Sequence, residues 1–421
     1  MCQWLWDHIR SRTEDLYIPG RTCDAWAAAA GAGHRHVCEW LLAVDSDARL
    51  TGAVNASARG GHADLAEWLG GFNFSDNAYE YLRDVTHGCD LPTLQRAWPC
   101  CVAFLDFDTK EGLISSAAGR PTPDWAAKVE WMVAQGCPRS DEAADAAACL
   151  PNNDGEALAR LTWLRGRGYP VHVRAVHAAA HSGNTAALLY LLAEVSNGAL
   201  DRERENAVCG AVEDGHLAAL QALHTAGWTI VQLPEHSTVR AARGGHLHVL
   251  AWLLDTLDPE AVVLNAQLFS AAAKSGNMEL LVWLRQRGCP WDSTAYLGAA
   301  EAGWEAALEW LVEQGCPMED SEMPYIKACD NGDLATARCL RRLGVPWGPE
   351  GKVFSAAAWE NYQTAPLPLL RWLLLEEDCP VDLEAAKKSA AEWGSVRPKW
   401  SAKVLELLEV VGYRSRQPQR R

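Results

Sequence analysis

One phrase returns along most of this chain, and its return limits the possible folds more than any other feature. The phrase that begins at Ser270 runs through an alanine triplet, a glycine and an apolar segment to Gly-Cys-Pro-Trp, and a second copy of the same order follows from Ala299. A repeat of fixed period is typical of a solenoid, in which each unit buries its apolar face against its neighbours. We therefore expect a stack of small units, with a binding surface as the general class of function.

A column of tryptophans marks the units when they are aligned on their second apolar segment. The residue after each member is almost always leucine, from Leu41 to Leu373. Spacings mostly fall between 27 and 33 residues, and a single gap of 63 residues holds a degenerate unit around Leu91 to Trp98. The column reads Trp40, Trp68, Trp131, Trp163, Tyr190, Ala222, Trp252, Trp283, Trp310, Cys339 and Trp372.

Each unit carries the start and stop signals of two short helices. An alanine run such as Ala271–Ala273 opens the unit, because alanine is the best helix former and lets helices approach closely. A glycine such as Gly276 ends this segment by adopting the left-handed conformation that stops helices. The apolar second segment ends at Gly288-Cys-Pro, where proline prevents continuation. The pattern predicts an all-α solenoid of about 12 to 13 helix-turn-helix repeats, each followed by an extended loop.

The units divide the chain into three expected parts. Residues 1–20, with Trp4, Leu5 and Ile9 at helical spacing, are expected to form an N-terminal capping helix. Residues 21–413 are expected to form the repeat array, degenerate around 70–125 and 384–413. Residues 414–421 are polar and basic, and we expect a disordered tail, with a nuclear-import or phosphate-binding patch as the alternative.

Composition narrows the class of protein. Apolar residues make up 49% and charged residues 22%, which is typical of a folded chain. The net charge of −16 argues against nucleic-acid binding, which needs a basic surface, and favours basic or neutral partners. No apolar stretch reaches the roughly 18 to 20 residues of a membrane helix, so we expect no membrane partner. The start lacks the order of a secretory signal.

The cysteines indicate a reducing compartment and structural thiols. The chain has 14 cysteines and no CxxC pair, which fits free thiols in the cytoplasm or nucleus. Adjacent Cys100 and Cys101 are expected to stay unpaired, because neighbouring residues rarely form an unstrained disulfide. The position directly after the second glycine of a unit accepts several apolar side chains. It therefore needs a large apolar side chain and not a thiolate. It holds Cys137, Cys289, Cys316 and Cys379, and also Tyr169, Val345 and Trp228.

Histidines recur directly after the first glycine of a unit, and a turn or capping role is favoured there over a metal site. Other units place Asn277 or Asp333 at the same position, and both residue types suit a helix N-cap. Stacked helices lie about 8 to 10 Å apart, whereas zinc needs nitrogen ligands at about 2.0 to 2.1 Å. We expect no metal and no cofactor. The histidines of this column are His34, His62, His216 and His246.

The tryptophans are mostly explained by packing. One tryptophan per unit is what contact between repeats uses, and this reading is favoured over a stacking platform for bases or sugars. Trp291, Trp304 and Trp347 lie at loop or turn positions, where an exposed indole is suited to anchor a partner. No Ser/His/Asp grouping, GxGxxG or P-loop motif occurs, and the repeats use nearly the whole chain, so we expect no enzyme.

Taken together, these phrases resemble the ankyrin repeat family, in its divergent subtype with a GHLxVLxWLxxxGCPW phrase. The match is carried by Gly245-His-Leu-His-Val-Leu-Ala-Trp-Leu253 and Gly288-Cys-Pro-Trp291, and the resemblance covers roughly residues 21–413. The Thr-Pro-Leu-His opening of that family is absent from every unit. Tetratricopeptide and HEAT units, at about 34 and 40 to 47 residues, fit the short units less well. The resemblance implies an ankyrin-type stack that recognises proteins without catalysis.

The function that follows from this resemblance is a monomeric, non-catalytic scaffold that binds a protein through its concave face and loop tips. An adaptor in ubiquitin-linked protein turnover is the alternative, and an enzyme with a hidden site is a third reading. Specificity is expected at loop tips, because loops on a rigid frame concentrate recognition residues. The expected partner-binding residues are Trp291, Asp292, Met318, Glu319, Asp320 and Trp347.

Overall fold

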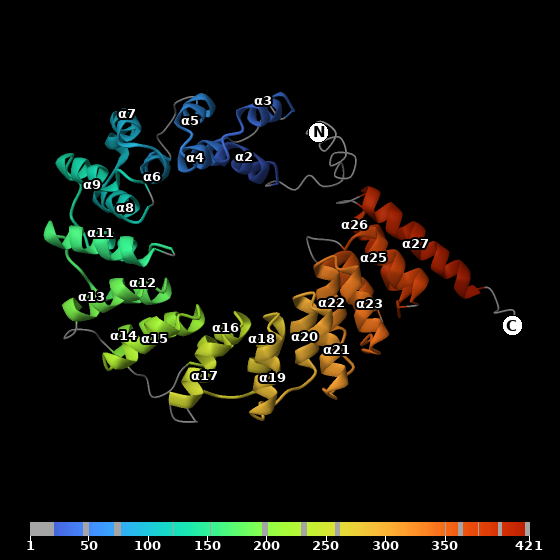
Figure 1. The fold of residues 1–421 in the computed structure, drawn as a ribbon. Helices are drawn as coiled ribbons and strands as arrows, with labels where there is room; N and C mark the ends of the chain where they lie inside the picture. Colours follow the sequence, from blue (N-terminus) through green and yellow to red (C-terminus); the bar gives the residue numbers. More distant parts are fainter. Residues whose placement is uncertain are drawn as a thin grey trace. The chain divides into compact units, whose positions relative to one another are not determined.

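The computed structural model describes most of the chain as helices. The described ranges are 21–44, 50–70, 77–120, 122–151, 153–195, 201–228, 234–256, 262–349, 351–360, 365–377, 379–394 and 398–416. They fall into two compact units, 21–228 and 234–416. Every element in these ranges is helical, and within each unit helix pairs lie side by side (Figure 1). The predicted all-α repeat solenoid is confirmed. The helix expected at residues 1–20 lies outside the described residues.

Helix pairs in the N-terminal unit follow one another in the same order, and the described residues 77–120 contribute to this series. The first helices are α2 (Arg21–Gly31), α4 (Thr51–Arg59), α6 (Ala78–Gly88), α8 (Phe107–Ala118), α10 (Glu142–Ala148), α12 (Val173–His181) and α14 (Asp201–Glu213). The second helices are α3 (Arg35–Val44), α5 (Ala63–Leu69), α7 (Leu91–Cys101), α9 (Trp125–Ala134), α11 (Asp154–Gly166), α13 (Thr185–Val195) and α15 (Leu217–Thr225), with the 3₁₀ turn η1 (Val102–Phe104) after α7.

The C-terminal unit has the same plan, with π-helical turns near its end. Its first helices are α16 (Glu235–Arg243), α18 (Ala266–Lys274), α20 (Thr294–Glu301), α22 (Met323–Asp330), α24 (Lys352–Ser355), which continues into η2 (Ala356–Glu360), and α26 (Leu383–Trp393). Its second helices are α17 (Leu247–Thr256), α19 (Met278–Gln286), α21 (Glu305–Glu313), α23 (Leu334–Arg342), α25 (Leu367–Arg371), which continues into η3 (Trp372–Glu376), and α27 (Pro398–Arg416).

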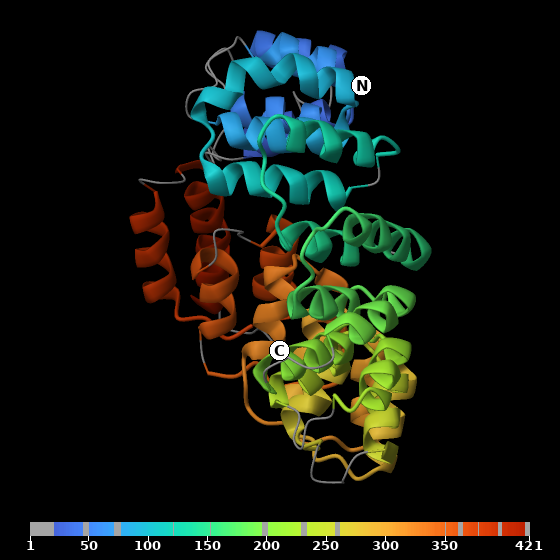
Figure 2. The same cartoon turned by 90° about the vertical axis from the view of Figure 1, so that its left-hand side faces the viewer.

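Within each unit the first helices form one layer and pack closely on one another. Figure 2 shows the cyan and green pairs of the N-terminal unit stacked one above another. The alanine runs make this possible, and Ala271, Ala272 and Ala273 on α18 are all buried. The leucine column forms the core, since Leu164 and Leu284 are completely buried. Most of the tryptophan column is half-buried beside it, as at Trp163 and Trp283, whereas Trp372 is buried and Trp68 is exposed.

The C-terminal carbonyl groups of a first helix are satisfied by the following repeat. A helix leaves its last four carbonyl groups without intrahelical partners, and burial makes unpaired groups costly. Asn184 Nδ2, which precedes α13, donates to the carbonyls of Ala148 and Leu150 at 2.8 Å each. Asn277 Nδ2, which precedes α19, donates to the carbonyl of Gly245 at 3.0 Å. These contacts fix each repeat onto the one before it.

In one stretch of the N-terminal unit a buried cation takes over this task. Lys128 on α9 is completely buried, and its Nζ donates to the carbonyls of Thr86 and Cys89 at 3.1 and 2.5 Å and lies 3.2 Å from Asp124 Oδ1. Arg160 on α11 donates to the carbonyls of Ala118 and Arg120 at 2.8 and 2.6 Å. The Arg160 side chain thus reaches the end of α8 and the turn that follows it.

Removing the Lys128 ammonium should therefore destabilise the N-terminal unit. We expect Lys128→Met to lower its free energy of unfolding by about 2 to 5 kcal/mol, because buried carbonyls and a carboxylate lose their partner. Urea denaturation followed by tryptophan fluorescence measures the change. Lys110→Met, at a half-exposed lysine of the neighbouring helix α8, is the control and should stay within about 0.5 kcal/mol of the native value. Equal effects of both substitutions would contradict this role.

Candidate functional site

The tryptophans expected at loop tips contact side chains on the helices of their own repeats. Trp291 is half-buried, with its ring 5.4 Å from Phe269 in an edge-on contact and the Arg285 guanidinium 4.0 Å above it. Trp347 lies 4.1 Å from the ring of Tyr325. Each indole thus connects the first helix of its repeat to the loop that follows the second helix of the same repeat. Such positions stiffen the stack and leave part of the indole at the surface.

The remaining residues of the expected set differ in their surroundings. Asp292 Oδ1 accepts hydrogen bonds from Thr294 N at 2.9 Å and Thr294 Oγ1 at 2.5 Å, which orders the start of α20. Met318, Glu319 and Asp320 are exposed on the next loop. The six residues come from three successive loops and form no single cluster that a described contact joins. Their part in binding stays a prediction.

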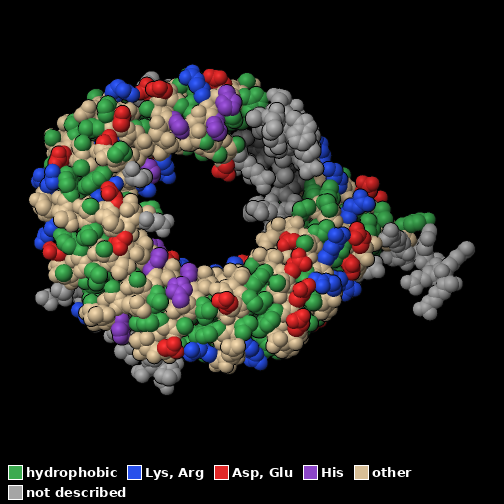
Figure 3. Space-filling view, viewed as in Figure 1, with side chains coloured by type: hydrophobic (Ala, Val, Ile, Leu, Met, Phe, Trp, Pro, Cys, Tyr) green, Lys and Arg blue, Asp and Glu red, His purple; other side chains and the backbone are tan. Residues whose placement is uncertain are grey.

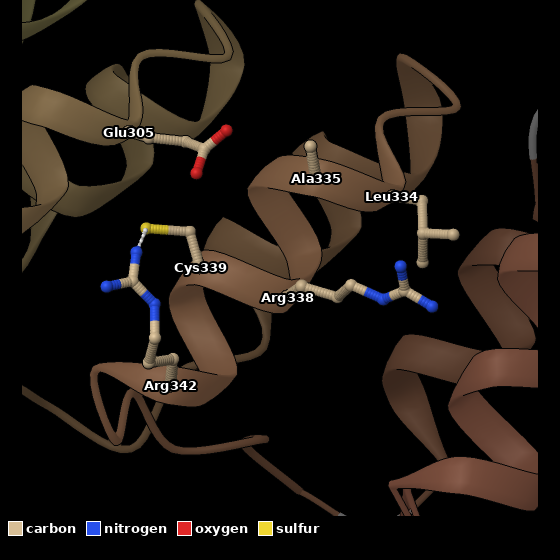
Figure 4. A pocket seen from close by; sticks show the side chains of 6 residues that line it. All are labelled: Glu305, Leu334, Ala335, Arg338, Cys339 and Arg342. Carbon is tan, nitrogen blue, oxygen red and sulfur yellow. Dashed lines mark hydrogen bonds between the residues drawn. The ribbon is translucent and has the colours of Figure 1, made fainter.

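A hollow opens where the tryptophan column lacks its tryptophan. Cys339 occupies that place on α23, and a cavity of about 500 Å³ lies between α21 and α23. Figure 4 shows Glu305 and Arg342 on opposite sides of the hollow, with Cys339 between them and Arg338 pointing away. Arg342 donates to Glu309 at 2.6 Å, so its charge is already paired.

The histidine column makes close contacts between repeats. The ring of His62 covers Gly33, whose φ of 71° favours glycine, and a Cβ added at Gly33 would overlap that ring. His216 covers Gly183, with a φ of 70°, in the same way. The predicted turn role is confirmed, although neither His62 nor His216 caps its helix with the side chain. No group of three or more possible metal ligands occurs among the described residues.

The asparagine and aspartate of the same column cap their helices, as the sequence predicts. Leu280 N donates to Asn277 Oδ1 at 3.1 Å, and Thr336 N donates to Asp333 Oδ1 at 3.0 Å. Both side chains therefore begin a second helix, and Asn277 also binds the preceding repeat. A single position thus fixes the helix start and the contact between units.

The cysteine column is apolar, as predicted. Cys137, Cys289, Cys316 and Cys379 are buried free thiols. Burial raises the pKa of Cys289 to about 11 and the pKa of Cys316 to about 12, so these thiols stay protonated at neutral pH. The Cys316 thiol donates weakly to the carbonyl of Asp292, at 3.4 Å. Cys100 and Cys101 are both free as well. Thiolate chemistry is disfavoured at all these buried positions.

A cluster of arginines on the first helices of the N-terminal unit has more positive charge than its counterions balance. Arg59 on α4 reaches across to Asp84 on α6, with Nη2 and Nε at 2.8 and 3.0 Å from Oδ1. Arg83 Nε lies 3.5 Å from the same oxygen, and Asp84 is only 2% exposed. Arg120, which follows α8, is exposed, and the described residues form no ion pair with its side chain. We call Arg59, Arg83 and Arg120 the arginine cluster.

The electrostatics of nearby groups report this excess of positive charge. Burial and the guanidinium groups of Arg120 and Arg59 lower the pKa of His87, on α6, to about 4. Partial burial and Arg59 also lower the pKa of Arg120 below its usual value. Like charges that depress one another's pKa values favour an anion as a further partner. The site can hold an anion, and it contains no activated nucleophile.

Tyr79 completes the surface beside the arginine cluster. It is half-buried on α6, one turn before Arg83, and the Arg83 guanidinium lies 5.8 Å from the centre of its ring. Gly112 on α8 faces the Tyr79 hydroxyl, and a Cβ added there would overlap the oxygen. Ser116 Oγ on α8 donates to the carbonyl of Arg83 at 3.2 Å, which ties α8 to α6. The aromatic ring and the charges are thus held in a fixed relation.

Comparison with known proteins finds a general likeness in fold. No protein-family model matches the chain, and no curated protein matches it. Among solved structures, the maize pentatricopeptide repeat protein PPR10 aligns with 16% identity over 98% of this chain and 71% of that chain, at a TM-score of 0.38. Two structures of the same protein bound to an 18-nucleotide psaJ RNA element align with 16% identity over 96% of this chain and 63% of theirs, at 0.36. At these scores the likeness is to stacked helix pairs only.

These comparisons correct the family and the function expected from sequence. The ankyrin assignment is wrong, since the structures that align belong to another helical repeat family. Short units and Gly-x-Pro loops are what any stack of short helix pairs needs, so they do not identify one family. The ankyrin-type protein-binding scaffold and the ubiquitin-linked adaptor rested on that assignment and are withdrawn with it.

The expected absence of a nucleic-acid partner is corrected too. Two of the aligned proteins are bound to RNA. The exclusion rested on the net charge of −16, which averages over the whole chain and does not describe a local surface such as the arginine cluster. No described helix is long and apolar enough to cross a bilayer.

The hollow at Cys339 predicts that a larger side chain is tolerated there. Cys339→Trp should change the free energy of unfolding by less than about 1 kcal/mol, because the indole fills existing space. Cys329→Trp is the matched control, since Cys329 on α22 is 1% exposed in a packed layer and its replacement should cost at least about 2 kcal/mol. Urea denaturation measures both. A larger loss for Cys339→Trp would show that the hollow cannot take an indole.

The buried thiols predict a loss of stability in alkali. The folded chain keeps the Cys316 proton up to a pKa of about 12, whereas the unfolded thiol loses it near its ordinary value of 9.0. The folded state therefore binds more protons in this window, and the free energy of unfolding falls as pH rises from about 9 towards 12, by about 1.4 kcal/mol per pH unit and thiol.

Cys316→Val tests this effect, because the next repeat carries Val345 at the same position. The variant should match the native protein at neutral pH and lose stability less steeply above pH 9.0. Denaturation midpoints across that range give the comparison. Equal slopes for the variant and the native chain would assign the alkaline loss to other groups.

Proposed function

We propose that this chain is a non-catalytic helical-repeat scaffold that binds an anionic macromolecule at the arginine cluster. One observation supports this function above others. Arg59 and Arg83 contact one buried carboxylate, Asp84, and Arg120 of the next repeat interacts electrostatically with Arg59 and Asp84, so the first-helix layer has a local excess of positive charge. A fixed excess of charge attracts a ligand of opposite sign and raises its rate of association.

Arginines on or next to the second helices form one-to-one ion pairs, and the arginine cluster differs from them in this respect. Arg167, directly after α11, pairs with Glu130 on α9 at 2.7 Å, and Arg342 on α23 pairs with Glu309 on α21 at 2.6 Å. Such one-to-one pairs link neighbouring repeats and leave little charge for a ligand. Figure 3 shows acidic and basic side chains interspersed over the face it views. On an acidic chain, a local cationic site confines a polyanion to one place.

The absence of catalysis in the proposal rests on the chemistry of the available groups. The buried cysteines are held as thiols, and a thiol is a poor nucleophile until it is deprotonated. His87 has a pKa of about 4 and is therefore neutral at pH 7, but none of its described contacts places it against a nucleophile. The cluster is suited to hold a ligand.

Heparin, a soluble polyanion, provides a direct test. We expect the native chain to bind fluorescent heparin in low salt, and Arg83→Gln/Arg120→Gln to weaken binding by roughly 10- to 100-fold, since each charge-assisted contact contributes about 1.5 kcal/mol or more. Fluorescence anisotropy measures the affinity. Because Arg120 lies among like charges, its loss should leave the unfolding midpoint unchanged or raise it.

Arg96→Gln/Arg165→Gln is the matched control, with the same change in net charge at exposed arginines of the second helices α7 and α11. It should bind heparin nearly as well as the native chain. If both double variants lose affinity equally, binding reflects net charge and the cluster is not the site. If the native chain binds no heparin, the proposed function is wrong.

A further inference from the structure

We propose that the ligand of the arginine cluster is a single-stranded nucleic acid, with its phosphates on the arginines and a base on Tyr79. This inference rests on the proposed function and adds the class of ligand. Two separate features support it: the charges are spread over successive repeats, and an exposed part of an aromatic ring lies beside them.

The spread of charge favours an extended ligand with repeated negative groups. Arg59, Arg83 and Arg120 belong to, or directly follow, α4, α6 and α8, which pack side by side as first helices. Neighbouring helix axes in such layers lie about 8 to 10 Å apart. The Arg59 and Arg83 guanidinium groups converge on Asp84, so one phosphate can contact both. Arg120, however, follows the next first helix, and a polymer with a phosphate in every unit can contact all three. The ligand therefore lies across the helices, from repeat to repeat.

The aromatic ring favours a nucleic acid over a polyanion without bases. Tyr79 and Arg83 are one turn apart on the same face of α6, and the guanidinium lies 5.8 Å from the ring centre. Proteins that bind single strands combine a cationic track for the backbone with aromatic rings that stack on bases. The close approach of Gly112 fixes the Tyr79 hydroxyl against α8, so the ring is already positioned before a ligand arrives.

The same ring favours a single strand over a duplex. Bases in a duplex are stacked on their neighbours, and a side chain reaches their faces only after unstacking them. A strand with free bases places phosphate and base on Arg83 and Tyr79 without that cost. His87, one further turn along α6, is neutral and can exchange a hydrogen bond with a base edge.

Binding of fluorescein-labelled oligouridylate of about twelve nucleotides tests the proposal. We expect the full chain to bind it more tightly than the duplex formed with its complement. Arg120→Gln should weaken binding roughly tenfold and reduce the slope of log affinity against log salt by about 0.7. Tyr79→Ala should weaken binding roughly tenfold, and Tyr79→Phe should retain native affinity because the ring remains. Arg96→Gln should have little effect.

The probes separate failure of this inference from failure of the proposed function. If heparin binding depends on the arginine cluster but oligouridylate does not bind, or binds equally to the Tyr79→Ala variant, the ligand is another polyanion and this inference is overturned. Tighter binding of a phosphoserine peptide than of oligouridylate would also overturn it. If neither heparin nor oligouridylate responds to Arg120→Gln, both proposals are wrong. Circular dichroism of each variant checks that the helices remain folded.

Discussion

The structure depends on hydrogen bonds that side chains of one repeat donate to backbone carbonyl groups at the ends of the first helices of the preceding repeat. These helices are short, and their final carbonyls are buried once the stack forms, so each repeat must supply donors to its predecessor. Asn184 and Asn277 do this with an amide, and Lys128 and Arg160 do it with a cation. The alanine-rich layers pack closely, and these donors determine which register of stacking satisfies the backbone.

Features that recur in every repeat could be predicted from sequence, because periodicity is their cause. The paired helices, the buried leucine column and the apolar cysteine column all recur at regular spacing, and the structure contains them. The caps at Asn277 and Asp333 were predictable for the same reason. A family could not be identified this way, since the same spacing suits any solenoid of short helix pairs.

Features that occur once could not be predicted, and the candidate site is one of them. Lys128 and Arg160 stand where other repeats have buried apolar residues such as Leu280, and no local pattern reveals that a lysine is buried. The arginine cluster depends on Arg59 and Arg83 meeting at Asp84 with Arg120 of the next repeat nearby, while the sequence reports only a net charge. Trp291 and Trp347 are also contacted by neighbouring aromatic rings that the repeat pattern did not predict, and their part in binding a partner stays a prediction.

The differing donors also constrain how such a chain can change its length. At some joints an asparagine, such as Asn277, donates a hydrogen bond to a carbonyl in the turn of the preceding repeat. A repeat joined in this way can be duplicated or lost together with that turn, because the same contact forms again at the new joint. The joints made by Lys128 and Arg160 also need the carboxylates of Asp124 and Glu156 beside the two cations. Growth of the array by whole repeats is therefore permitted in some places and blocked around α8 to α11, which lie next to the arginine cluster.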